Sequence, residues 1–125
     1  MNYKKETIKS FEEVLKSLQE KVPANGFRIL HIHDVKQTLK EKGFDIDNYS
    51  IVEVCNAKFA NCVINVNKEY GVMMPCKINV YSDEGKTVIL TPEPTIMASR
   101  FGMTGIEDIA GDVDAALKKI IDESI

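Results

Sequence analysis

Apolar and polar residues alternate in several short runs of the chain, and this pattern predicts β-strands. The clearest run is Tyr49 to Cys55, which is rich in valine and isoleucine and is typical of a buried strand. Cys76 to Tyr81 alternates in the same way and places Cys76, Ile78 and Val80 on one apolar face. Weaker strands are predicted over residues 3–7, over 87–91, and over 27–33 with Phe27, Ile29, His31 and His33 on one face.

Apolar residues at spacings of three and four predict helices between these strands. A helix over residues 10–22 begins with the capping box Ser10 to Glu13, and another runs from Asp34 to Lys42. Helices are also predicted over 57–66 and 95–103, and an apolar stripe predicts a long one that begins with the capping box Thr104 to Glu107. These elements predict a single domain over residues 1–125. Its fold class is α+β, a two-layer arrangement of four to five mostly antiparallel strands with helices packed on one face.

Composition narrows the classes of protein and partner. The chain is 44% hydrophobic and 28% charged, with a net charge of -3 and no basic patch interleaved with aromatics, so we expect no nucleic-acid partner. No apolar stretch approaches the ~18 residues that span a bilayer, so we expect no membrane partner. Three cysteines without close pairs, and a start that lacks an apolar signal core, predict a cytoplasmic protein.

Two cysteines at strand ends are the main candidates for chemistry. Cys55 ends the first strand and Cys76 opens the second, directly after Pro75. Glu53 lies within an apolar strand, where burial would raise its pKa and make it a candidate proton carrier. The interpretation that we favour is a glutamate at an edge or on an open face of the sheet, beside a lysine. The chain contains neither a glycine-rich phosphate loop nor a Gly-x-Ser-x-Gly motif. The thiols are therefore the groups from which we expect any chemistry.

The histidine pair is a weak metal signal. His31 and His33 have a spacing that suits a metal, but two imidazoles supply only half of the ligands of a site. No further His, Cys or Asp residues at zinc-finger spacing accompany them. Asp34 is explained as a helix N-cap, and Asn56 as a cap or turn residue. Cys62 is interpreted as a small buried hydrophobe. We predict no metal and no cofactor.

Several of these segments resemble one small bacterial and archaeal family, the domain of unknown function 302. The matching motifs are Glu53-Val54-Cys55-Asn56, Met74-Pro75-Cys76-Lys77 and His33-Asp34-Val35, and Ala57 stands where the family usually has proline. The resemblance implies a two-layer α+β fold and a homodimer, with no established reaction. It also implies a candidate site without assigned roles: His33, Asp34, Glu53, Cys55, Asn56 and Cys76.

Four functions are compatible with these residues. We favour a dimeric module that binds a small molecule or a partner near the two cysteines, rather than an enzyme. The first alternative is thiol chemistry, with Cys55 and Cys76 as a redox couple or one of them as a nucleophile with Glu53 or His33 as base. The second is metal or haem ligation by His33 with both cysteines. The third is a purely structural role.

Overall fold

Five antiparallel strands form one sheet in the order β1-β5-β4-β3-β2. The computed structural model describes residues 2–125, so Met1 lies outside the described residues, and the expectations about the chain start rest partly on it. The predicted α+β fold with helices on one face of the sheet is confirmed. The strands are β1 (Asn2–Thr7), β2 (Arg28–Asp34), β3 (Tyr49–Cys55), β4 (Cys76–Asp83) and β5 (Lys86–Pro92).

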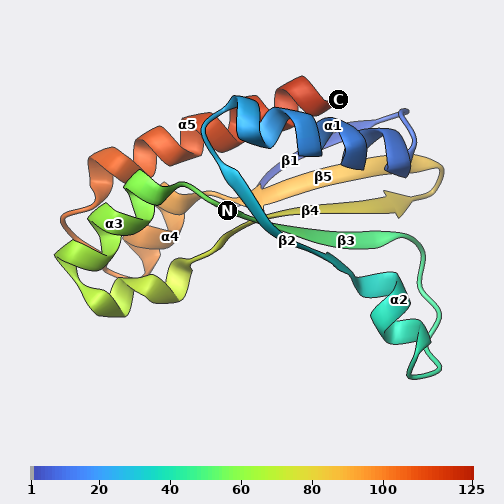
Figure 1. The fold of residues 1–125 in the computed structure, drawn as a ribbon, viewed down its shortest axis with the longest axis horizontal. Helices are drawn as coiled ribbons and strands as arrows, with labels where there is room; N and C mark the ends of the chain where they lie inside the picture. The colour runs from blue at the N-terminus through green and yellow to red at the C-terminus, as the bar shows by residue number, and fades with distance from the viewer. Residues whose placement is uncertain (1) are drawn as a thin grey trace.

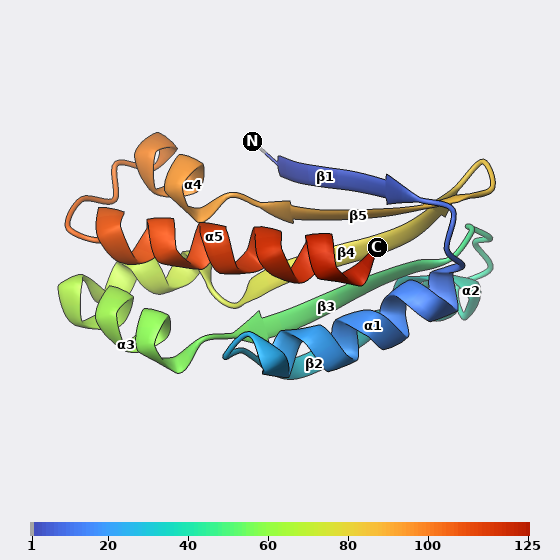
Figure 2. The ribbon, with the colours of Figure 1, turned by 90° about the horizontal axis from the view of Figure 1, so that it is seen from above.

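Two long helices cover one face of the sheet, and shorter helices lie at its ends (Figure 1). Seen from above, α1 and α5 lie over the strands, while α3 and α4 gather at one end of the sheet and α2 at the other (Figure 2). Within residues 2–125, no helix is long and apolar enough to cross a membrane. The helices are α1 (Phe11–Ala24), α2 (Val35–Lys40), α3 (Ala57–Val66), the 3-10 helix η1 (Lys68–Met73), α4 (Pro94–Arg100) and α5 (Glu107–Ser124).

The hydrophobic core lies between the sheet and the pair α1 and α5. Alternate residues of β3 and β4 point into it, because successive side chains of a strand face opposite sides of the sheet. No helix covers the other face (Figure 1), and its side chains are exposed or half-buried apart from Val88. The core residues include Val14, Leu18 and Val22 of α1, Val113, Leu117, Ile120 and Ile121 of α5, and Val52, Val54, Ile78 and Val80 of the sheet.

The turn between β4 and β5 is a two-residue hairpin that contains Gly85. Glu84 and Gly85 have φ angles of 47° and 80°, which is the positive pair that a two-residue type I′ hairpin requires. Glycine adopts this conformation without a steric cost, so Gly85 fixes the hairpin. The hairpin in turn sets β4 against β5, with Asn79 opposite Leu90.

One prediction about β2 is wrong. The register shifts between Ile29, which lies opposite Val54, and His31, which lies opposite Glu53. This irregularity places Ile29 on the core face and His31 on the open face, so the two do not share a side as strict alternation predicted. Burial of the apolar side chain and exposure of the imidazole explain why the shifted register is favourable: Ile29 packs against the core, whereas His31 is exposed.

The predicted capping box at the start of α5 is also wrong. Ile106 occupies the cap position and makes no side-chain cap hydrogen bond. The Glu107 carboxylate instead accepts a hydrogen bond from the Gly105 N–H at 3.0 Å. The Thr104 N–H donates to the Tyr70 hydroxyl at 3.1 Å. Thr104 therefore ties the loop before α5 to η1.

Candidate functional site

The register between β3 and β4 fixes where the two strand-end thiols lie. Val54 is directly opposite Cys76, and Glu53 is opposite Lys77. Cys76 therefore shares the core face with Val54, whereas Cys55 shares the open face with Glu53. Both are free thiols and are not at disulfide distance. The two cysteines are close in the fold but point to opposite sides of the sheet.

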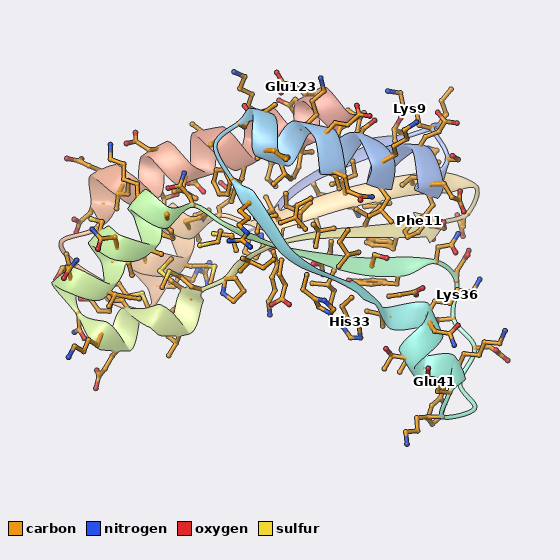
Figure 3. All side chains as sticks on the ribbon, viewed as in Figure 1. Lys9, Phe11, His33, Lys36, Glu41 and Glu123 are labelled. Carbon is orange, nitrogen blue, oxygen red and sulfur yellow. The ribbon has the colours of Figure 1, made fainter. Side chains whose placement is uncertain are left out.

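His33 and Asp34 lie towards the other end of the sheet, beside α2. His33 is opposite Ile51, four residues before Cys55, which at the rise of a strand corresponds to about 13 Å. Figure 3 shows the His33 side chain pointing away from α1 and α5. Its Nε2 is 2.9 Å from the Thr38 hydroxyl. The distance of about 13 Å along β3 argues against a single metal or haem bound by His33 and both cysteines.

Two of the predicted site residues, Asp34 and Asn56, cap the helices that follow them. The Asp34 carboxylate accepts the Gln37 N–H at 3.0 Å and caps α2. Asn56 Oδ1 accepts the Phe59 N–H at 3.0 Å and caps α3. Each interaction satisfies a backbone donor that the first turn of a helix leaves free. Both residues thus have a structural role in place.

The described chain lacks a cluster of conventional metal ligands. No group of three or more His, Cys, Asp or Glu side chains within residues 2–125 is arranged to hold a metal ion. Glu53 is half-buried on the open face between His31 and Lys77. It stays apart from Cys76, which lies on the other side of the sheet.

Cys76 lies on the wall of a cavity at the end of the sheet where α3 and α4 gather. The cavity has a volume of about 200 Å³. Most of its lining is apolar, and Lys77 and Thr91 contribute the polar groups. The Thr91 hydroxyl donates to the Lys77 carbonyl oxygen at 2.8 Å, so it is already paired. The lining residues are Val72, Met73, Met74, Pro75, Cys76, Lys77, Thr91, Pro92, Pro94, Met97 and Leu117.

A buried carboxylate near this wall was missed by the sequence analysis. Asp114 of α5 is 8% exposed, and its Oδ2 accepts a hydrogen bond from the Thr95 hydroxyl. Its Oδ1 is buried and has no hydrogen-bond partner among residues 2–125. A buried polar atom without a partner is costly and calls for an explanation. The signal in the sequence was an aspartate between Ala110 and Leu117, at helical spacing within the apolar stripe.

The environment of Cys76 keeps its thiol protonated. Burial, followed by the charges of Cys55 and Asp114, raises the pKa of Cys76 from 9.0 to about 11. Only the thiolate is a good nucleophile, and at neutral pH about one molecule in ten thousand carries it. These properties make Cys76 an unreactive thiol, which weighs against the redox alternative.

Alkylation of Cys76 should therefore show a high apparent pKa. We expect the rate with iodoacetamide to rise about tenfold per pH unit up to a plateau near pH 11. Asp114→Asn should lower the plateau pH because it removes a negative charge, and Asp112→Asn on the exposed side of α5 should leave it unchanged. Peptide mass spectrometry would measure the rate at Cys76. A plateau below pH 9 would contradict the burial of this thiol.

The comparisons with known proteins give a family and a solved structure. The model of the family described as "Domain of unknown function DUF302" matches residues 3–124. A crystal structure described as an uncharacterized conserved protein DUF302 from Bacillus stearothermophilus is similar, with a TM-score of 0.93 and 31% sequence identity. That match covers 99% of this chain and 98% of the other. No curated protein matches the chain. The match over nearly its whole length shows that this chain belongs to the DUF302 family.

Proposed function

We propose that the chain is a binding module for a small apolar molecule, held in the cavity beside Cys76. The cavity itself is the observation that carries this proposal. An apolar cavity of 150 Å³ in a folded protein is known to bind benzene, and this one has a volume of about 200 Å³. Three prolines and three methionines line it, so an occupant would meet mostly carbon and sulfur.

The cavity lies between elements that come from distant parts of the chain. Met73 and Pro75 precede β4, Pro92 ends β5, and Met97 and Leu117 belong to α4 and α5. The Lys118 ammonium of α5 forms an ion pair with Glu93 at 3.1 Å, which ties α5 to the start of α4. This arrangement supports a preformed site, because its walls are held together by contacts that need no ligand.

The thiol-based alternative has less support. A redox couple needs two sulfurs that can approach within bonding geometry, and side chains whose Cβ atoms point apart cannot be bridged without backbone movement. A nucleophile needs an exposed thiol with a lowered pKa. The pKa of Cys76 is raised and not lowered, so this thiol does not meet that requirement. Binding therefore remains the function that the geometry favours.

Indole is a probe of the right size for this cavity. Three of the five methionines, Met73, Met74 and Met97, line it, whereas Met103 does not. In protein labelled with methyl-¹³C methionine, we expect indole to shift these three methyl signals and leave Met103 in place.

Met97→Phe should fill part of the cavity and weaken indole binding by roughly tenfold, which is about 1.4 kcal/mol. Met103→Leu is the control and should bind normally. Indole shifts confined to Met103, or no shifts at all, would contradict the proposal.

We also propose that the chain forms a homodimer through the open face of the sheet. The rings of Tyr49 and Tyr81 stack there with centroids 5.3 Å apart, beside half-buried Ile51. Glu53 and Lys77 lie opposite each other on the same face. A two-fold axis through this region would bring Glu53 of one copy close to Lys77 of the other, as a self-complementary surface requires.

Sedimentation equilibrium would test the dimer. We expect the wild-type chain to sediment at about twice the monomer mass, and Ile51→Lys to shift it to monomer because two lysines would meet near the axis. Ile64→Lys places the same charge on exposed α3 and should leave the mass unchanged. A wild-type monomer would refute the dimer, as would a dimer that only Ile64→Lys disrupts.

A further inference from the structure

Half of the sulfur-containing side chains of this protein line a single cavity. The chain has five methionines and three cysteines, and four of these eight residues lie on the cavity wall. Met73 comes from the end of η1, Met74 and Cys76 flank Pro75, and Met97 comes from α4. Two separate segments, residues 73–76 and α4, thus contribute sulfur to one space of about 200 Å³.

Methionine usually serves to fill irregular gaps in a core. Here Met73, Met74 and Met97 line a cavity of about 200 Å³ that their side chains leave open, so gap filling does not account for them. Met73 is buried and packs in the core, and Met74, Cys76 and Met97 are half-buried against its edge. Packing therefore restrains these side chains, while the cavity that they line stays unfilled.

Thiolate and thioether sulfurs are soft ligands, and sets of them select Cu(I) over zinc and other harder metals. The charge balance also favours a monovalent ion. One thiolate neutralises Cu(I), so the loaded site carries no net charge into the apolar cavity, whereas a divalent ion would leave an excess charge that is costly to bury.

We propose that this cavity is a Cu(I) site, with the Cys76 thiolate as the anchoring ligand and thioethers from Met74, Met97 or Met73 completing the coordination. The inference goes beyond the proposed function, because it assigns a second kind of ligand, a Cu(I) ion, to the cavity that we propose to bind a small apolar molecule. Binding forms a sulfur–copper bond and breaks the S–H bond of Cys76. The proton leaves to solvent, and neither sulfur nor copper changes oxidation state.

Anaerobic titration of the full chain with Cu(I), in competition with the chromophoric chelator bicinchoninate, tests the site. We expect one Cu(I) per wild-type chain. Cys76→Ser should lose at least about tenfold in affinity, and Met97→Leu, which conserves volume, should also lose roughly tenfold. Cys62→Ser and Met103→Leu are matched controls outside the cavity and should bind within about twofold of wild type.

X-ray absorption of the wild-type copper complex gives a readout that needs no variant. A first shell of sulfur alone supports the site, and a shell that contains nitrogen or oxygen overturns it. Retained affinity in Cys76→Ser, or a loss in Cys62→Ser instead, also overturns it. If copper does not bind but indole shifts the cavity methionines, only the copper inference fails. If neither probe reaches Met73, Met74 or Met97, the cavity-binding function fails with it.

Discussion

The register between β3 and β4 is the constraint on which the site depends. With Val54 opposite Cys76, the first residue of β4 faces the core and the last residue of β3 faces away from it. A slip of one residue would exchange these sides and bring Cys76 out from beneath the helices. The buried valines of both strands hold this register, because a slip would expose Val52 and Val54.

Packing of α4 and α5 at the end of the sheet leaves space that the side chains do not fill. Protein interiors are normally close-packed, so a cavity and an unpaired buried carboxylate both reduce stability. Asp114 adds its negative charge to the burial that keeps Cys76 protonated. Such costs are typical of sites kept for a ligand, and here the cavity and the unpaired carboxylate occur within one region of the fold.

Local patterns in the sequence predicted most of the fold. Ser10 caps its helix as expected, and the valine-rich run before Cys55 forms the predicted strand. The register shift after Ile29 could not be predicted, because it depends on the partner strand and not on alternation within β2. For the site, Cys76 was identified, but its separation from Cys55 depends on strand register. Asp114 could not be recognised from the apolar stripe of the last helix, because that stripe predicts which face is buried and not which polar residue lies within it.

The arrangement of the two strand-end thiols is most directly tested by oxidation of the folded protein. Native protein would be treated with diamide, and its disulfides mapped by peptide mass spectrometry. Because Cys55 and Cys76 lie on opposite faces of the sheet, the account predicts no disulfide between them in the folded chain. A Cys55–Cys76 disulfide that forms without loss of the fold would contradict the register and the shielded position of Cys76.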